Sequence, residues 1–173
     1  MSAFDDAFES TVKLEAASGD NATAYGITEA VGRKEGYMGA MSELPLETAK
    51  KIYQDRYWRP LQLDHIAEVS QPVALKLFDT GVNMGIGTAA KFLQRSLNAL
   101  NRQQADYPDM RVDGAIGPKT VAAFRAFIDK RKPQGETVLL KAISSLQGAR
   151  YIEIAESREE NEKYIFGWLA TRV

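Results

Sequence analysis

The sequence predicts an all-α, mainly helical protein that folds as a single compact domain. Hydrophobic residues make up 45% of the 173 residues, which is enough to build a buried core in a chain of this length. In most segments they recur every three or four residues, as in an amphipathic helix, and no series of alternating positions predicts a set of strands. Cysteine is absent, so packing and not disulfide bonding must stabilise the fold.

The N-terminal segment predicts a helix over residues 3–16. Its apolar side chains recur close to helical spacing: Phe4, Phe8, Val12 and Leu14. Glu15 therefore falls in the last turn of this helix. The small, polar residues 18–25 have the composition of a turn or a short hairpin. Residues 28–32 again have a sequence typical of a helix, and an irregular, Gly-rich tract follows them.

The middle of the chain predicts three helices. The first covers residues 46–57 and has one apolar face, formed by Ala49, Ile52, Tyr53 and Tyr57. Residues 72–84 are apolar on several sides, which is typical of a central buried helix. Another helix, residues 88–101, follows the glycine break at 85–87.

The last third predicts further helices after a polar stretch, residues 101–110. Pro118 suits the first turn of a helix. Residues 136–158 form a long periodic segment, and residues 164–169 add an aromatic C-terminal piece. For function we divide the chain into residues 1–100 and a helical C-terminal region, residues 101–173, packed into the same domain.

Composition excludes several functional classes. The 22 basic and 23 acidic residues nearly cancel, so there is no broad positive field to hold nucleic acid. With no cysteine and one histidine, His65, the chain has neither a thiol nucleophile nor the Cys/His spacing of a zinc site. No secretory signal or bilayer-spanning stretch is visible. We expect a protein made in the cytoplasm, with no metal, organic cofactor or membrane insertion.

A carboxylate at the end of the first predicted helix suggests acid catalysis. Cleavage of a glycosidic bond needs a protonated carboxyl group and usually a second carboxylate, which attacks or stabilises the sugar cation or activates water. Glu15 supplies the first group, and Asp20 is the only carboxylate in the following turn. Thr23 and Tyr25 can hydrogen-bond a water or a sugar hydroxyl. An ordinary solvated Glu and Asp is the alternative interpretation.

Four stretches follow one another between about residue 8 and residue 127: VKLE with ATAYGIT, LETAKKIYQDRYWRP, LFDTGVNMGIGTAAKFLQRSLN and VDGAIGPKTVAAF. In this order they resemble the glycoside hydrolase family 108 muramidases, which include phage endolysins and secretion-associated relatives. The first resembles the family's catalytic helix-end Glu and its downstream Tyr-Gly-Ile-Thr signature. The last is also similar to motifs of peptidoglycan-binding modules.

One departure from the family concerns the second acid. The family usually has Glu-Gly-Gly-Tyr and a longer loop that holds an Asp, whereas here Glu15 is followed by Ala-Ala-Ser and a shorter loop. Asp20 stands where the family places a Gly, so the identity of the second catalytic group stays open. Glu9 keeps the family's longer spacing to Tyr25 but lacks the helix-end context, and it is the alternative acid.

The resemblance implies a lysozyme-like N-acetylmuramidase that cuts peptidoglycan at the β-1,4 bond between N-acetylmuramic acid and N-acetylglucosamine. Glu15 would protonate the leaving oxygen, and Asp20, or a water held by Thr23 and Tyr25, would act at the anomeric carbon. The resemblance also implies a phage, prophage or secretion-system setting, with a holin-type or secretion-system route to the periplasm. Host, cross-link preference, oligomeric state and retention or inversion at the sugar stay open.

Tyr25, Trp58 and Asn83 are the predicted substrate-binding residues. Trp58, with its neighbour Tyr57, follows a predicted helix and could stack on sugar rings, although a core anchor is the commoner role of such residues. Asn83 lies one helical turn after Asp79 in an apolar block, so a structural hydrogen bond is the main interpretation, and lining of the cleft is the other.

The motif at residues 113–120 predicts a turn that feeds a helix, because Asp-Gly suits the turn and Pro118 the helix start. Lys119 within it could meet a carboxylate of a peptide stem.

Two other classes of protein remain compatible with the sequence. One is a catalytically inactive peptidoglycan-binding or structural prophage protein, in which the changed Glu-Gly-Gly motif has removed the reaction. The other is a helical interaction module, such as a toxin partner, which would have no affinity for purified sacculi. A lytic transglycosylase is a variant of the leading hypothesis and would release anhydro-muramic products.

Overall fold

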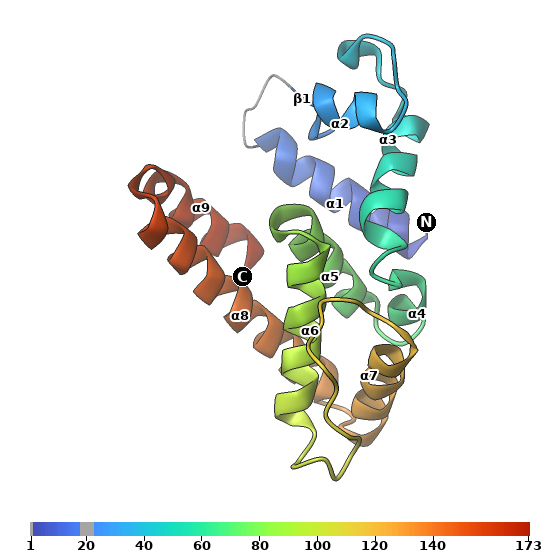
Figure 1. Ribbon diagram of the computed structural model, residues 1–173, viewed down its shortest axis with the longest axis vertical. Helices are drawn as coiled ribbons and strands as arrows, with labels where there is room; N and C mark the ends of the chain where they lie inside the picture. Colours follow the sequence, from blue (N-terminus) through green and yellow to red (C-terminus); the bar gives the residue numbers. More distant parts are fainter. Residues whose placement is uncertain (1, 18–22) are drawn as a thin grey trace.

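Helices make up almost all of the regular structure (Figure 1). The computed structural model describes residues 2–17 and 23–173, with the side chains of residues 14–17 and 23 outside that description. The α-helices are α1 (Ala3–Ala17), α2 (Glu29–Lys34), α3 (Leu46–Tyr53), α4 (Leu63–Ala67), α5 (Gln71–Met84), α6 (Ile86–Leu100), α7 (Pro118–Lys130), α8 (Gly135–Ser157) and α9 (Glu162–Arg172). The remaining elements are the 3₁₀ helices η1 (Met41–Glu43) and η3 (Glu159–Asn161), the π-helix η2 (Gln54–Trp58), and the strands β1 (Thr23–Ala24) and β2 (Ile27–Thr28). The predicted all-α class is confirmed.

Within the described part of the chain, no helix combines the length and the apolar character needed to cross a membrane.

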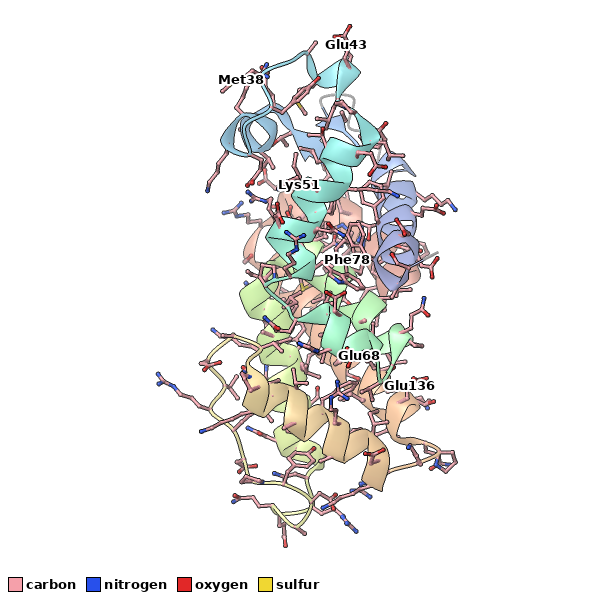
Figure 2. The ribbon with its side chains drawn as sticks, turned by 90° about the vertical axis from the view of Figure 1, so that its right-hand side faces the viewer. Met38, Glu43, Lys51, Glu68, Phe78 and Glu136 are labelled. Atoms are coloured by element: carbon pink, nitrogen blue, oxygen red, sulfur yellow. The ribbon has the colours of Figure 1, made fainter. Side chains whose placement is uncertain are left out.

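A cluster of aromatic rings around Phe78 of α5 forms the core of the first half. The Phe78 ring is 0% exposed, and its centroid lies 6.1 Å from that of Phe4, 6.0 Å from Tyr53, 6.4 Å from Tyr57 and 5.7 Å from Trp58. Three of these pairs meet edge to face, which aromatic quadrupoles favour. Figure 2 shows Phe78 between α1 and α3. The cluster therefore fixes α1 against α3, η2 and α5.

A π-turn changes which aromatic residue enters this core. The period of an α-helix predicts that Tyr57, four residues after Tyr53, continues the buried face. Instead α3 ends at Tyr53, and η2 closes with a hydrogen bond of 2.9 Å from the Arg59 amide to the Gln54 carbonyl, five residues earlier. The extra residue per turn brings Trp58 into the buried face and leaves Tyr57 half-buried at its edge. The other residues of the predicted apolar face, Ala49, Ile52 and Tyr53, are buried as predicted.

Helix α5 occupies the centre of the fold, as its apolar sequence predicts. It begins at a cap, where the Ser70 hydroxyl accepts a hydrogen bond of 3.2 Å from the Val73 amide. It ends at Gly85, whose φ of 89° favours glycine, and the chain turns there directly into α6. Helix α6 starts at Ile86, two residues before its predicted beginning.

The C-terminal helices extend the same core. Helix α8 packs against α5 and α6 and then runs outward with α9 as a helical hairpin (Figure 1). Leu139 and Ile143 of α8 belong to the hydrophobic cluster that contains Phe78. At the end of α9, the Arg172 guanidinium donates a hydrogen bond of 2.6 Å to the Asp79 carboxylate of α5. Core packing therefore continues across both halves of the chain.

Helix α4 was not predicted, because His65 was assigned to a connection. The segment forms a short helix whose apolar residues Leu63 and Ile66 are fully buried, while His65 is exposed.

Replacing Phe78 with Ala is expected to lower the free energy of unfolding by about 3–5 kcal/mol, because the lost ring leaves a cavity between α1, η2 and α5. Phe166→Ala is the matched control: the same side chain is removed from α9, where 83% of it is exposed. There the change should be less than about 0.5 kcal/mol. Urea unfolding followed by circular dichroism measures both. Equal losses in the two variants would contradict the central role of the cluster.

Candidate active site

A tight hairpin turn forms one side of the candidate site. Strands β1 and β2 pair antiparallel, with Thr23 opposite Thr28. The turn residues Tyr25 and Gly26 both have positive φ angles, 54° and 74°, as a type I′ turn requires. This conformation costs a non-glycine residue about 1 kcal/mol. The Tyr53 hydroxyl offsets part of that cost by donating a hydrogen bond of 2.9 Å to the Tyr25 carbonyl.

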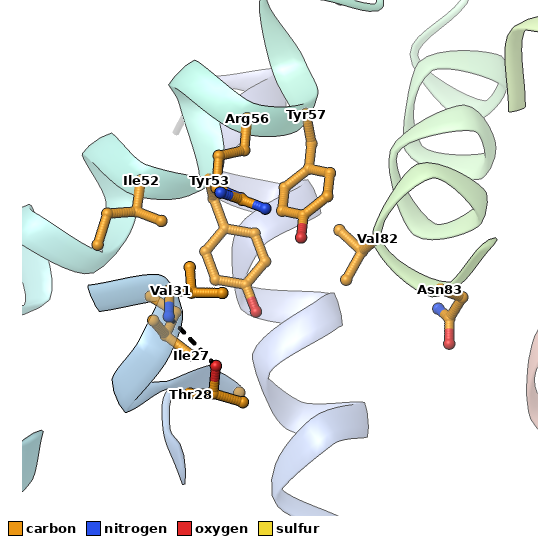
Figure 3. Close-up of a pocket in the computed structure, with 10 residues that line it drawn as sticks. Ile27, Thr28, Val31, Ile52, Tyr53, Arg56, Tyr57, Val82 and Asn83 are labelled. Carbon is orange, nitrogen blue, oxygen red and sulfur yellow. Dashed lines mark hydrogen bonds between the residues drawn. The ribbon is translucent and has the colours of Figure 1, made fainter. Parts of the chain in front are cut away.

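A hollow of about 350 Å³ lies beside this hairpin (Figure 3). It is bounded by the hairpin and α2, by α3 and η2, and by the end of α5. The lining residues are Gly26, Ile27, Thr28, Val31, Ile52, Tyr53, Arg56, Tyr57, Val82 and Asn83. An apolar surface with a few polar groups is the usual form of a small-ligand site. None of these lining residues carries a carboxylate, so any acid that acts here must come from a neighbouring segment.

Two residues of the π-helix provide the polar and aromatic groups of one wall. The Arg56 guanidinium forms an ion pair of 2.8 Å with Glu35 and lies 5.9 Å from the centre of the Tyr57 ring. Hydrogen bonds with the Glu35 carboxylate and then with Tyr57 raise the pKa of Arg56 above its ordinary value. Its buried Nε has no hydrogen-bond partner among the described residues. Figure 3 shows the guanidinium and the Tyr57 ring side by side.

Asn83 stands at the opposite wall and is held by a polar network. Its side-chain amide donates to the Asp79 carbonyl at 2.9 Å and to the Asp79 carboxylate at 3.2 Å. The same carboxylate accepts the hydrogen bond from Arg172 of α9. Asn83 is therefore hydrogen-bonded within the fold and also lines the hollow, and its role in substrate binding stays a prediction.

In the sequence, the predicted catalytic residues run from the last turn of α1 to the first strand of the hairpin. The backbone places Glu15 in the last turn of α1, as predicted. Its position follows Phe4, Phe8 and Thr11 by about three, two and one helical turns, so all four share one face of the helix. The first three of these are buried.

The catalytic assignments themselves remain predictions. Thr23 lies in β1, and its side chain, like that of Glu15, is outside the description. Asp20 lies outside the described residues altogether. Among the described residues, no group of three or more His, Asp or Glu is placed to hold a metal ion.

Trp58 is a correction to the predicted substrate-binding set. Only 2% of it is exposed, its ring packs against Phe78, and its indole N–H donates a hydrogen bond of 2.7 Å to Asp64. No ring face is left for a sugar, so Trp58 is a core anchor. Tyr57, and not Trp58, lines the hollow, because the π-turn leaves Tyr57 at the edge of the core. Arg56 was not predicted, since nothing in its local sequence indicates that the π-turn directs it to this wall.

Comparison with known proteins finds two family regions along the chain. Residues 9–85 match the glycosyl hydrolase 108 family, and residues 88–173 match the predicted peptidoglycan domain. The solved structure of SagA from Brucella abortus shares the fold, with a TM-score of 0.58 at 19% sequence identity, over 97% of this chain and 96% of that chain. The search of curated proteins gave no match.

The fold, the hollow and the two family matches together define a helical glycoside hydrolase that acts on peptidoglycan. The first half of the chain, residues 9–85, is similar to the glycosyl hydrolase 108 family, and residues 88–173 are similar to the predicted peptidoglycan domain. The resemblance inferred from the four sequence stretches is confirmed. The two matched regions meet at the turn between α5 and α6.

Tyr53→Phe should destabilise the hairpin, because it removes at least the hydrogen bond to the strained Tyr25 carbonyl. We expect a loss of about 1 kcal/mol in the free energy of unfolding, with faster amide exchange in residues 23–28. Tyr37→Phe is the control, since its hydroxyl makes a comparable bond to the Ala40 carbonyl in an exposed loop. Unchanged exchange at the hairpin in Tyr53→Phe would show that the turn does not depend on this bond.

Proposed function

We propose that the protein is an N-acetylmuramidase, which hydrolyses the β-1,4 bond between N-acetylmuramic acid and N-acetylglucosamine. The observation that supports this most directly is the position of Glu15. It lies in the last turn of α1, on the helix face shared with buried residues, and the hairpin that bounds the hollow is the next element along the chain. The hollow supplies binding groups without a carboxylate, and Glu15 supplies the acid that the reaction needs.

In the proposed reaction, the Glu15 carboxyl donates its proton to the glycosidic oxygen as the bond to the anomeric carbon breaks. Positive charge then develops on the sugar ring. Asp20, or a water held by Thr23 and Tyr25, acts at the anomeric carbon; on either route a water supplies the hydroxyl of the new reducing end, and its proton restores the Glu15 acid. The turn fixed by Tyr53 holds the backbone of residues 23–28 in one conformation, which favours a constant position for these groups.

Binding of the sugars is assigned to the two walls of the hollow. The Tyr57 ring offers an apolar face for a pyranose, and the part-exposed guanidinium of Arg56 offers N–H donors suited to the carbonyl oxygen of an acetamido group. Asn83 faces them from the end of α5, its amide oriented by Asp79.

We propose the biological setting that the family resemblance implies. The enzyme would act on the cell wall in the periplasm, reach it by a holin-type or secretion-system route, and serve a phage, a prophage or a phage-derived secretion system in a bacteriolytic role.

Glu15→Gln keeps the shape of the side chain but cannot donate the proton. We expect the rate to fall by about 100- to 10,000-fold, the range over which general acid catalysis contributes. The measurement is turbidity loss and released reducing ends on purified Gram-negative peptidoglycan, with circular dichroism to confirm the fold. Muramic acid at the new reducing ends identifies a muramidase, and anhydro-muramic ends would identify a lytic transglycosylase instead.

Glu9→Gln is the matched control, because Glu9 is the alternative acid and is exposed on the same helix. It should retain activity. An inactive Glu9→Gln with an active Glu15→Gln would move the acid to position 9. A native protein that binds sacculi but releases no reducing ends would identify an inactive peptidoglycan-binding protein.

Tyr57→Ala tests the binding wall. We expect KM for peptidoglycan to rise about three- to tenfold, because one aromatic contact with a sugar ring is lost. Tyr57→Phe keeps the ring and should keep KM. If both variants raise KM equally, the hydroxyl and not the ring face is the binding group.

A further inference from the structure

A second hollow in the C-terminal half has the form of a peptide-binding groove. It has a volume of about 1000 Å³ and lies between the long loop at residues 101–117 and helix α7. We propose that this groove binds the acidic peptide stems of peptidoglycan. The proposal rests on peptidoglycan as the substrate, and it gives the second half of the chain a defined ligand.

The loop that forms the groove is held rigidly by Gln94 of α6, a side chain that is 2% exposed. Its amide nitrogen donates to the Asp113 carboxylate at 2.9 Å and to the Ala115 carbonyl at 3.0 Å. Its amide oxygen accepts a hydrogen bond of 3.0 Å from the Gly114 amide. The groove is therefore formed before any ligand binds, and the ordering cost of binding is small.

The other part of the loop is fixed in the same way. Asn98 of α6 forms two hydrogen bonds with the Met110 backbone, 2.7 Å and 2.9 Å long. The Tyr107 hydroxyl donates to the Leu97 carbonyl at 2.8 Å. Long loops without secondary structure are uncommon in compact domains and are usually functional when they are ordered.

The groove carries two charges of each sign, and its cations are the groups available to the carboxylates of a ligand. Two carboxylates line it, but both are used within the fold: Asp109 accepts a hydrogen bond of 2.6 Å from Asn101, and Asp113 accepts those of Gln94 and of the Ala115 amide. Two cations line it as well, Arg111 and Lys119, and neither forms an ion pair or hydrogen bond with a described residue. The groups left for a ligand are therefore the cations.

The apolar surface of the groove is built from small side chains. Ala122, Ala123 and Ala126 of α7 line one side, with Pro118 at the start of that helix and Met110 on the loop. Such a surface fits methyl groups. Peptide stems combine alanine methyl groups with several free carboxylates, which is the chemistry that these alanines and cations match. A peptide-free glycan strand also carries acetamido and lactyl methyl groups, but it has only one carboxylate for each muramic acid, whereas a stem has several along a short chain.

The groove is connected to the hairpin hollow by a close backbone contact. Gly114 has a φ of 80°, and a Cβ atom there would lie 3.2 Å from the Gly87 carbonyl at the start of α6. Helix α6 begins directly after α5, whose last turn carries Asn83. A stem held in the groove would thus be held relative to the hollow where the glycan is cut.

The first experiment measures binding of a fluorescent tetrapeptide, L-Ala-γ-D-Glu-diaminopimelate-D-Ala, to the full-length protein by anisotropy. The double variant Arg111→Ala/Lys119→Ala should bind about tenfold more weakly, because two charge-assisted contacts are lost. Ala122→Trp, at an exposed position, should also weaken binding by filling the groove. The matched control is Lys141→Ala/Arg150→Ala, which removes two exposed cations from α8 and should leave the affinity unchanged.

Because the tetrapeptide contains no glycosidic bond, this result does not depend on muramidase activity. Peptide binding that the groove variants weaken would support the groove even in a protein that cleaves nothing. Equal affinity in native protein, groove variants and control would overturn the proposal even in an active muramidase. Displacement of the tetrapeptide by a peptide-free glycan oligosaccharide at lower concentration than by unlabelled peptide would also overturn it, in favour of a sugar site.

Discussion

The packing of Phe78 against four other rings is the interaction on which the rest of the structure depends. Phe4 joins the first turn of α1 to this cluster, and one turn later the Phe8 ring lies 5.3 Å from that of Tyr53. These contacts fix the direction of α1, and with it the place where its last turn ends. Tyr53 connects the cluster to the hairpin through its hydroxyl. The helix end that carries Glu15 and the turn that bounds the hollow are therefore both positioned by one group of aromatic side chains.

The π-turn gives two adjacent aromatic residues different environments. A continuous α-helix would bury Tyr57, whose hydroxyl would then need a partner inside the core. The five-residue turn buries Trp58 instead, and Asp64 satisfies its indole N–H. Tyr57 is left at the edge, where its ring can meet both the cluster and a ligand. Hydrogen bonds in a π-turn are less favourable than those of an α-helix, and π-turns persist most often at functional sites. Burial of the indole offsets that cost here.

Sequence periodicity predicted most helices, because each has an apolar stripe that must be buried. Two boundaries followed from local chemistry at Gly85 and Pro118, which act on the backbone next to them. The role of Trp58 could not be predicted, since the π-turn depends on the rings packed around it and not on residues 54–58 alone. The shape of the groove in the C-terminal half was also beyond prediction, although the sequence pointed to Lys119 as a group that could meet a peptide stem. Its loop has no periodic pattern, and its conformation is set by Gln94 and Asn98, which lie on another helix.

The site was predictable only in part, for the same physical reason. The helix-end position of Glu15 and the place of Asn83 near the end of the central helix followed from spacing within single helices, and the catalytic and binding roles of these two residues stay predictions. Arg56 reaches the hollow only because η2 packs beside the hairpin, and that contact joins segments distant in the chain.

The two family regions are joined without a flexible linker, and this limits how the enzyme can use its second half. Binding modules on flexible tethers raise the local concentration of substrate but do not fix its orientation. Here Gly85 is the only residue between α5 and α6, and the core is continuous from Phe78 to Leu139. Arg172, near the C-terminus, also holds Asp79 and through it Asn83. A ligand bound as proposed in the second half would thus be held at a fixed position relative to the hollow, and it would select which bond is presented to the proposed acid.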